Sequence, residues 1–374
     1  MRAYLDWNAT TPPHPDVVVA MRRALEKSWG NPASVHADGR LARAEVEGAR
    51  GSLADLLGAD PRDVVFTSGG TEANNLAIRA AFPSGGPRRR LVTSRLEHPS
   101  VTRVAEALEA EGRADVRWLE VDPAGIPRLD DVALALASGD VALVALQAVN
   151  HETGAIQPLR AVAPLVAAAG ALLHVDAVQA AGKVDLPEIA LADTVAVAAH
   201  KLRGPKGIGG LVHRPHVQIT PVLRGGDQER GVRPGTVDPV ACAGLRAALG
   251  RAADSCVQYA RMAARRDAFE AHLVALGGVP VLPADAPRAP HVASLTFERW
   301  SGAELVAALD LEGVSVSSGS ACSAGTVERS PVLAAMVGAE RAGRGLRVSL
   351  GDGTTDDELD LAREAFARVL ARVK

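Results

Sequence analysis

The chain has 374 residues, of which 47% are hydrophobic and 23% are charged, and its formal net charge is -3. A chain of this length can bury a large core and is long enough for two domains. The nearly balanced charge gives no indication of a nucleic-acid or other polyanionic partner.

The first residues, MRAYLDWNATTPPHPDV, lack the apolar stretch of a secretory signal. No window approaches about 18 uninterrupted apolar residues, so we expect no membrane span. The three cysteines, Cys242, Cys256 and Cys322, are widely separated and odd in number. This pattern argues against a disulfide framework or a zinc site, so we expect no metal and a cytoplasmic location.

Short apolar segments alternate with helical segments over the first two-thirds of the chain. The predicted strands are 63–67, 91–94, 141–149, 171–175, 194–198 and 209–213. This alternation predicts an α/β fold with a mostly parallel sheet covered by helices on both faces. Ligands of such sheets bind beyond the carboxyl ends of the strands. The polar residues that follow predicted strands in this way are Thr71, Asn150, Asp176 and Lys201.

The pattern changes near residue 251. A long charged helix is predicted over 251–276, and a Pro-rich connection then leads to the last predicted strands, 292–297, 314–317 and 346–350. A final helix begins with a capping box formed by Thr355 and Glu358. We therefore expect a large domain over 14–251 and a smaller α+β domain made of 1–13 and 252–374.

The segment Ser68-Gly69-Gly70-Thr71-Glu72 lies between a predicted strand and a predicted helix. Free backbone N–H groups and the helix dipole favour a phosphate at such a place, and the hydroxyl of Thr71 adds a donor. An ordinary strand-to-helix turn has the same composition, so this segment alone does not decide between the two.

Two further residues indicate a charged, ring-shaped ligand. Asp176 falls where a buried strand ends, and a carboxylate there needs a cation or strong donors, such as a protonated pyridine nitrogen. Gln179 could reach a ring oxygen on the same side. The alternative is that Asp176 caps the following helix.

Lys201 follows an entirely apolar strand and precedes a Gly- and Pro-rich turn. Partial burial lowers the pKa of an ammonium group and frees the amine for imine formation. Most lysines are instead solvated surface residues, and Lys206 in the same turn is the competing amine.

Cys322 differs from the other cysteines in its surroundings. Cys242 and Cys256 have small, helix-compatible neighbours, whereas Cys322 lies in a Ser/Gly/Ala loop after a predicted strand. Such a loop suits a thiol that must travel and react, although a small residue in a tight turn remains an alternative.

Over almost its whole length the chain resembles the NifS/IscS-like cysteine desulfurases, which are fold-type I (aminotransferase class V) pyridoxal-phosphate enzymes. The resemblance is carried by YLDWNATTP, GNPASVH, VVFTSGGTEANNLAI, EHPSV, VNHETGAIQP, HVDAVQAAGK, AHKLRGPKGIGGL, GGDQERGVRPGT, SSGSACSAG and LRVSLG. It implies a large domain with a mostly parallel sheet, a smaller C-terminal α+β domain, and pyridoxal 5'-phosphate as cofactor.

The resemblance also implies roles for single residues. Lys201 would bind the cofactor as an imine, Asp176 would pair with the pyridine nitrogen, and Gln179 would contact the ring hydroxyl. His98 would stack on the ring and move protons. Arg347 would bind the substrate carboxylate with its bidentate fork, and Cys322 would be the nucleophile in a mobile loop.

The phosphate of the cofactor would be held by Gly70, Thr71 and His200. Thr236 would complete this group from the neighbouring subunit, so the resemblance implies a homodimer.

Two positions depart from the pattern of the relatives. Asn150 and His151 stand where the relatives commonly have two asparagines near cofactor and substrate, and His151 is bulkier and can titrate. Ala198 replaces a common serine, which removes a phosphate donor worth about 1 kcal/mol.

The expected reaction converts L-cysteine to L-alanine, with sulfur passing to Cys322 as a persulfide and then to an acceptor protein or thiol. Iron–sulfur cluster assembly and tRNA thiolation are possible destinations of the sulfur. The alternatives are another fold-type I enzyme, such as an aminotransferase, an epimerase or a selenocysteine lyase, and a cofactor-binding scaffold with little turnover.

Overall fold

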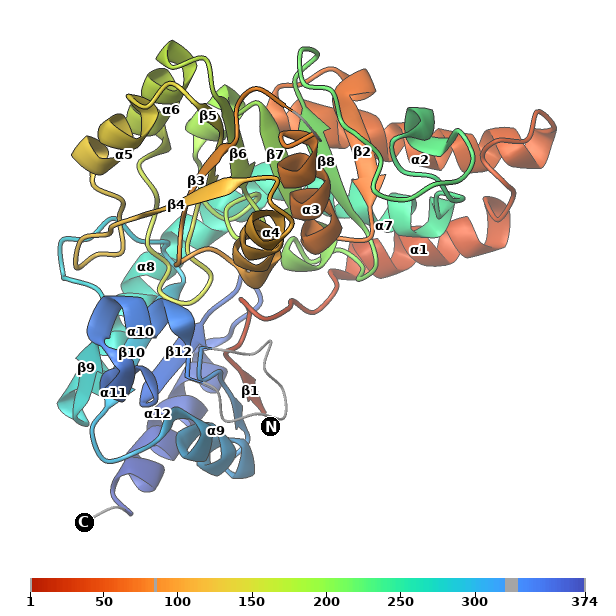
Figure 1. Ribbon diagram of the computed structural model, residues 1–374. Helices are drawn as coiled ribbons and strands as arrows, with labels where there is room; N and C mark the ends of the chain where they lie inside the picture. Colours follow the sequence, from red (N-terminus) through yellow and green to blue (C-terminus); the bar gives the residue numbers. More distant parts are fainter. Residues whose placement is uncertain (1, 84–85, 320–328, 373–374) are drawn as a thin grey trace.

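The computed structural model describes residues 2–83, 86–319 and 329–372. Figure 1 shows a large body built around a central sheet, and a smaller body that contains both ends of the chain. We propose that these bodies are the two domains expected from the sequence, and they are called the large and the small domain below.

Seven strands of the described residues form the central sheet of the large domain. Their order is β2 (Val64–Thr67), β8 (Gly209–His213), β7 (Thr194–Ala198), β6 (Leu172–Asp176), β5 (Val141–Gln147), β3 (Arg90–Ser94) and β4 (Asp115–Leu119). The strands from β7 to β4 are parallel, whereas β8 is antiparallel to both β2 and β7. The predicted α/β fold with a mostly parallel sheet is confirmed.

Successive side chains of the strands point to opposite faces of this sheet and pack against helices on both faces. Val64 and Phe66 of β2 pack in the cluster that contains α2, α6 and α7, whereas Val65 packs against α3. The helices of the large domain are α1 (Pro15–Lys27), α2 (Ala37–Leu57), α3 (Gly70–Ala80), α4 (Pro99–Ala110), α5 (Leu129–Leu136), α6 (Leu159–Ala168) and α7 (Pro239–Leu249). This period-2 alternation gives the layered architecture that was expected.

The predicted strands differ from the observed ones at some strand ends and at the edge of the sheet. The predictions for 194–198 and 209–213 match β7 and β8, whereas β5 ends two residues before the predicted 149. Strand β4 was missed because it lies at the edge of the sheet, and its first four residues alternate between exposed and half-buried positions. The sequence DVRWL therefore lacks the apolar run that identified the inner strands.

The small domain is built around a second apolar core. Its strands are β1 (Ala3–Tyr4), β9 (Gly278–Pro280), β10 (Val292–Phe297), β11 (Val314–Ser315) and β12 (Gly345–Ser349). Its helices are α9 (Gly302–Leu311), α10 (Pro331–Val337), α11 (Ala339–Ala342) and α12 (Asp356–Leu370), and α8 (Ala252–Ala275) joins it to the large domain. Phe269 of α8 and Phe366 of α12 are in contact within this core.

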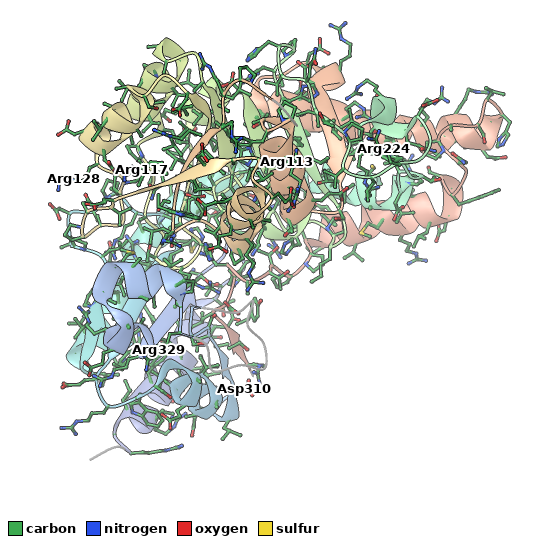
Figure 2. The ribbon with its side chains drawn as sticks, in the orientation of Figure 1. Arg113, Arg117, Arg128, Arg224, Asp310 and Arg329 are labelled. Carbon is green, nitrogen blue, oxygen red and sulfur yellow. The ribbon has the colours of Figure 1, made fainter. Side chains whose placement is uncertain are left out.

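The first residues of the chain belong to the small domain. Strand β1 pairs in parallel with β11, and Leu5 lies in the same apolar core as β10 and β12. Arg2 forms an ion pair with Asp310 of α9, which is labelled in Figure 2. The capping box of Thr355 and Glu358 at the start of α12 is present as predicted. Within the described ranges, none of the helices combines the length and apolarity needed to cross a membrane.

Candidate active site

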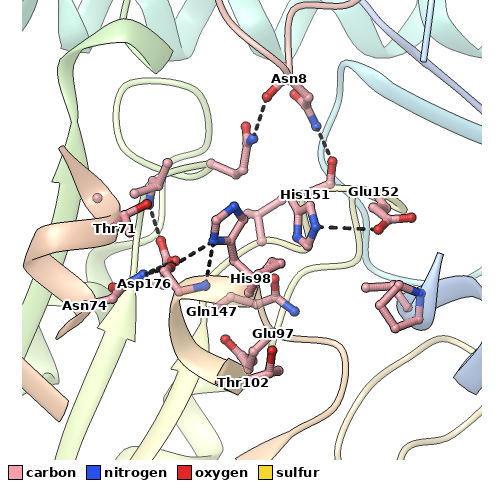
Figure 3. Close-up of a pocket in the computed structure, with 18 of the residues that line it drawn as sticks. Asn8, Thr71, Asn74, Glu97, His98, Thr102, Gln147, His151, Glu152 and Asp176 are labelled. Carbon is pink, nitrogen blue, oxygen red and sulfur yellow. Dashed lines mark hydrogen bonds and ion pairs between the residues drawn. The ribbon is translucent and has the colours of Figure 1, made fainter. Parts of the chain in front are cut away.

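A cavity of about 570 Å³ opens at the carboxyl ends of β5, β6 and β7, between the large and the small domain. Figure 3 shows the side chains that line it. Ten of the residues singled out in the sequence line this cavity: Gly70, Thr71, His98, His151, Asp176, Gln179, Ala198, His200, Lys201 and Arg347. The rule that ligands bind beyond the strand ends therefore located the cavity correctly.

Lys201 ends a short 3-10 turn that directly follows β7. Its ammonium group donates to the backbone oxygen of Asn8 and, at 2.9 Å, to that of Ala9. Both carbonyls belong to the segment between β1 and α1, so the N-terminal part of the chain holds this amine at the cavity wall. Lys206, the competing lysine, is exposed and does not line the cavity.

Asp176 is the last residue of β6 and is only 7% exposed. One carboxylate oxygen accepts from Nδ2 of Asn74 at 2.7 Å, and the other accepts from the backbone N–H of Val178 at 2.9 Å. Turn residues follow β6, so the alternative that Asp176 caps a helix is wrong. The carboxylate is instead fixed in orientation by two neutral donors.

Asn74 connects Asp176 to two histidines. Its amide nitrogen also donates to Oγ of Ser100 at 2.8 Å, and its oxygen lies 2.9 Å from Nε2 of His174. Ser100 in turn contacts Nδ1 of His98 at 2.8 Å through its hydroxyl, and its backbone N–H donates to the same nitrogen. Because Nδ1 of His98 accepts a hydrogen bond, the neutral ring carries its proton on Nε2.

His98 is the N-cap of α4, and Pro99 occupies the first position of that helix. The side chain of His98 lies within the cavity, and burial lowers its pKa, with Asp176 acting in the opposite direction. A histidine that is neutral near pH 7 can both give and take a proton, so the site offers a proton carrier beside Asp176.

The beginning of α3 forms another wall of the cavity. Its N-cap, Gly69, makes no side-chain capping bond, and Thr71 lies in the first turn. A Cβ atom on Gly70 would lie 2.6 Å from Cγ2 of Val178, so only glycine permits this close approach. A helix N-terminus with free N–H groups attracts anions, and the cradle at Gly70 leaves room for one.

His200 and Ala198 complete this wall. Burial, together with Lys201 and Lys206, lowers the pKa of His200 to about 4, so the ring is neutral near pH 7. Its Nδ1 lies 3.1 Å from the hydroxyl of Thr10. Ala198 lines the cavity and supplies no polar side-chain atom, in agreement with the donor lost at this position.

Gln179 is oriented by a buried lysine. The fully buried amine of Lys183 donates to Oε1 of Gln179 at 2.9 Å, and Nε2 of Gln179 donates to the backbone oxygen of Asn8 at 2.9 Å. Burial lowers the pKa of Lys183 well below its usual value, with Lys201 and Arg347 acting in the same direction. These two bonds fix the amide of Gln179, with Oε1 toward Lys183 and Nε2 toward the oxygen of Asn8.

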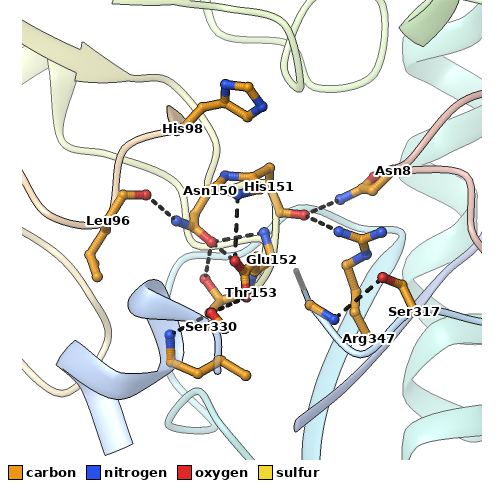
Figure 4. A network of polar contacts seen from close by, with 12 residues as sticks. Asn8, Leu96, His98, Asn150, His151, Glu152, Thr153, Ser317, Ser330 and Arg347 are labelled. Atoms are coloured by element: carbon orange, nitrogen blue, oxygen red, sulfur yellow. Dashed lines mark hydrogen bonds and ion pairs between the residues drawn. The ribbon is translucent and has the colours of Figure 1, made fainter. Parts of the chain in front are cut away.

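The two residues that follow β5 have different positions. The ring of His151 lines the cavity edge-on to His98, with 5.3 Å between the ring centroids, and burial keeps its pKa well below the usual value. Asn150 is fully buried, and its side-chain amide donates to the backbone oxygen of Leu96 and accepts from Glu152 and Thr153 within the turn (Figure 4). Asn150 therefore shapes the turn that carries His151 and does not itself line the cavity.

Arg347 of β12 reaches the cavity from the small domain. Its Nη2 donates to Asp6 at 2.6 Å, and its Nη1 donates to the backbone oxygen of His151 at 3.1 Å. Its Nε is buried and has no hydrogen-bond partner among the described residues. The guanidinium is therefore held firmly while part of its donor set stays available to a carboxylate ligand.

Besides Asn150, one described residue of the prediction does not line this cavity. Thr236 is in the loop between β8 and α7 and lines a different cavity of about 320 Å³, together with Arg50 and Glu229. Cys322 lies outside the described residues. The described residues nearest to it on either side, Gly319 and Arg329, both line the cavity of Lys201.

Several residues of the site were missed by the sequence analysis, above all Asn8, Asn74 and Glu152. Asn74 lies among Ala73, Leu76 and Ala77 on the buried face of α3, so a polar residue in an apolar stripe was a usable signal. Asn8 and Glu152 gave no such signal, because their partners come from distant parts of the chain.

The polar groups that line the cavity are complementary to those of pyridoxal phosphate. An amine, a buried carboxylate and a glycine cradle at a helix start correspond to its aldehyde, its pyridine nitrogen and its phosphate. Lys201, Asp176 and Gly70 are the residues that could hold these groups.

Comparison with known proteins agrees with this site. The model of the aminotransferase class-V family matches residues 3–361. The chain is 39% identical to a cysteine desulfurase of Cereibacter sphaeroides over 383 residues, which cover 100% of this chain and 97% of the relative.

Solved structures of similar proteins cover the chain as well. A NifS-like protein superimposes with a TM-score of 0.92 at 31% identity, covering 100% of both chains. A protein described as SspA in complex with cysteine superimposes with a TM-score of 0.82 at 29% identity, covering 94% of this chain and 100% of that one. From the family match over residues 3–361 and these relatives, we conclude that the chain belongs to the aminotransferase class-V family.

Proposed function

We propose that this protein is a pyridoxal-phosphate-dependent cysteine desulfurase that converts L-cysteine to L-alanine and transfers the sulfur to Cys322. The observation that carries the proposal is the arrangement of the cavity. One end holds Lys201 and Asp176, and the other is bordered by Gly319 and Arg329, between which Cys322 lies in the sequence. The cysteine desulfurase relative, which spans the full length of this chain, supports the same activity.

Bound pyridoxal phosphate would supply an aldehyde for imine formation and an electron-withdrawing ring. Lys201 would hold the aldehyde carbon through Nζ, Asp176 would keep the ring nitrogen protonated, and the start of α3 with His200 would bind the phosphate. Gln179 would donate an N–H group to the ring oxygen, because its Oε1 already accepts from Lys183.

Protons would be moved by Lys201 and His98. With substrate bound, Nζ of Lys201 would be a free amine and would take the proton from Cα of the substrate. The carbonyl groups of Asn8 and Ala9, which hold Nζ in this structure, keep the amine beside the cavity during this step. His98 carries its exchangeable proton on Nε2 and is placed to return a proton to the product.

The sulfur step would use the thiolate of Cys322. The thiolate attacks the sulfur of the bound substrate, an S–S bond forms, and the Cβ–S bond breaks with its electron pair staying on Cβ. Protonation of that carbon, together with the return of a proton to Cα, would give alanine, and Cys322 would be left as a persulfide for an acceptor thiol. Arg347 would hold the substrate carboxylate, since Asp6 and the oxygen of His151 already fix its guanidinium.

The substrate proposal is L-cysteine, and the complex of the SspA relative with cysteine supports it. The acceptor is proposed only by class, as a protein or small molecule with a free thiol, and iron–sulfur cluster assembly is one use of the sulfur. Neither Cys242 nor Cys256 forms a disulfide, which supports the proposal that the protein acts in the reducing cytoplasm.

A homodimer is part of the proposal. Apolar side chains are exposed on and after α1, including Val19 at 68%, Trp29 at 68% and Val35 at 85%. Exposed apolar side chains of this kind favour burial against another copy. Thr236 lies at a separate cavity of its own subunit, so it would contact a cofactor only across such an interface.

The experiment that tests the function is incubation of the cofactor-loaded protein with L-cysteine, with alanine and sulfide measured over time. The visible spectrum of the imine is recorded in parallel. Equal amounts of alanine and sulfide are expected in the presence of a reducing thiol. An imine spectrum without alanine would contradict the proposal and favour the scaffold alternative, and amino-group transfer to a 2-oxo acid would favour an aminotransferase.

A further inference from the structure

The carboxylate of Glu152 lies at the wall of the cavity, against Gly319 and Ser330, which flank residues 320–328 in the sequence. Glu152 follows His151 after β5, is only 2% exposed, and lines the cavity. One of its oxygens faces Nε2 of His151 at 3.6 Å, and the other accepts from the hydroxyl of Ser330 at 2.5 Å. Figure 4 shows this arrangement, with Glu152 between His151 and Ser330.

Glu152 contacts the small domain at two residues, and one of them is Ser330. It is the N-cap of α10, and its hydroxyl oxygen accepts from the backbone N–H of Leu333 at 3.0 Å. Because that oxygen accepts from Leu333, the single hydroxyl proton is available for the carboxylate. Ser330 is 2% exposed, so removal of the carboxylate would leave a buried hydroxyl without this acceptor.

Gly319 is the second contact. A Cβ atom on Gly319 would lie 2.6 Å from the same oxygen of Glu152, and the residue has a φ of +95°. Only glycine adopts this conformation readily and leaves space for the carboxylate. Glu152 therefore contacts the chain on both sides of residues 320–328, within two residues of each boundary of that range.

Glu152 is itself fixed by the large domain. Its backbone N–H donates to Oδ1 of Asn150 at 2.9 Å, and the amide of Asn150 donates to the backbone oxygen of Leu96. The buried turn thus presents the carboxylate from the end of β5, where the cofactor-binding strands also end. Burial raises the pKa of Glu152, and the bond from Ser330 and the charge of Arg347 act in the opposite direction.

We propose that Glu152 is a positioning residue for sulfur transfer: it fixes the two chain ends that flank the Cys322 segment against the wall of the cavity. This inference rests on the proposed function, since it concerns the placement of the proposed nucleophile. Glu152 does not exchange a proton or sulfur with the substrate in this role. Its effect is on how often the thiol reaches the reacting atoms.

The test compares Glu152→Ala, Glu152→Gln and Ser330→Ala in the cofactor-loaded protein. The matched control is Thr355→Ala, which removes a hydroxyl that caps α12 and contacts Glu358, outside the lining of the cavity. Two quantities are measured: kcat and KM for alanine formation, and the rate at which iodoacetamide alkylates Cys322, followed by mass spectrometry. The half-buried Cys256 is the internal reference for alkylation.

We expect Glu152→Ala to lower kcat about 10-fold or more, because misplacement of a reacting group by about 1 Å has effects of this size. KM should stay within about twofold, because substrate binding in the ground state is unchanged. The alkylation rate of Cys322 should change about fivefold or more, a magnitude set by the same loss of positioning. Glu152→Gln should restore most of kcat, since an amide oxygen can still accept from Ser330.

The proposal is overturned if Glu152→Ala leaves both kcat and the alkylation of Cys322 as in the unmodified protein, or if Thr355→Ala reproduces its effects. A rise in KM with unchanged kcat would also overturn it, because it would assign Glu152 to substrate binding. Alkylation of Cys322 is measured without turnover, so it tests the positioning role even if the protein forms no alanine and the proposed function fails.

Discussion

The two ends of the cavity are built in different ways. At the cofactor end, Thr71, Asp176 and Lys201 follow three strands of one sheet, and short hydrogen bonds fix their neighbourhood. At the other end, Arg347 is held by Asp6 and by the oxygen of His151, which are 341 and 196 positions away in the chain. The backbone positions of the first end are set by one sheet, with Asn8 and Ala9 adding contacts to Lys201, whereas the second end is formed only where distant segments meet.

Unused polar atoms occur in the cavity lining, among them Oε2 of Glu97 near Asp176 and two atoms toward the Arg347 end. Nδ1 of His151 and Nε of Arg347 are buried without a hydrogen-bond partner in the part of the chain that the structure describes. Leaving a buried polar atom unpaired costs about 1–3 kcal/mol unless a ligand pairs with it. We therefore expect bound substrate to interact mainly at the Arg347 end, whereas the Asp176 end is already ordered for the cofactor.

The largest effect is expected from Lys201→Ala. This variant removes both the imine-forming amine and the base, so alanine formation should fall by about 10³-fold or more. The imine absorbance near the visible range should also disappear. Lys206→Ala is the control, since Lys206 is exposed and outside the cavity, and it should keep nearly full activity. Equal losses in the two variants would break the assignment of the cofactor end.

Asp176→Asn should have the next largest effect. The amide keeps a similar shape but removes the charge that would stabilise a protonated ring nitrogen, so kcat should fall by about 10²-fold. The imine should still form, because Lys201 is intact. Asp193→Asn is a suitable control, since Asp193 precedes β7 and accepts from the backbone N–H of Leu173. Unchanged kcat in Asp176→Asn would contradict the proposed ring partner.

Asp6→Asn tests the other end of the cavity. Loss of the ion pair should let Arg347 turn away, so KM for L-cysteine should rise about 10-fold while the imine spectrum stays the same. The control is Asp310→Asn, which breaks the exposed pair with Arg2, because exposed pairs contribute only about 0–1 kcal/mol. If Asp6→Asn altered the imine spectrum and left KM unchanged, the division of the cavity into two ends would be wrong.

The smallest effect on activity is expected from the pH dependence of stability, which acts through His174 of β6. Burial lowers the pKa of His174 to about 4, and the ring contacts Asn74 and Thr194. The unfolded chain takes up this proton near pH 6.5, so His174 contributes stability above that pH and loses the contribution as pH falls toward 4.

The loss can reach on the order of 3 kcal/mol, and His174→Asn should reduce it. Urea unfolding at pH 7.5 and pH 5 measures the difference for both proteins. A pH dependence that is identical in the variant would assign the acid sensitivity to other groups.

The sequence predicted the groups of the cofactor end better than those of the other end. Asp176 and Lys201 were identifiable because a polar residue directly after a buried strand is unusual and has few possible positions. Asn150 follows β5 in the same manner, yet its amide is used inside the turn, because the pattern alone cannot tell which side chain of the turn faces the cavity. Cys322 lies outside the described residues, so its predicted role stays a prediction.

Contacts made by the N-terminal segment were beyond sequence reasoning. Asn8 donates to the oxygen of His151, accepts from His291, and offers its carbonyl to Lys201. These partners are separated from Asn8 by more than a hundred positions, and no local pattern predicts that they meet. Tertiary packing of the small domain against the strand ends brings them together.

The most direct test of the central claim is Cys322→Ser, assayed with L-cysteine for alanine while the imine spectrum is recorded. The proposed function predicts an unchanged imine spectrum together with the loss of alanine formation, because the cofactor end remains intact and only the sulfur-accepting thiol is absent. Full alanine formation by this variant would contradict the account.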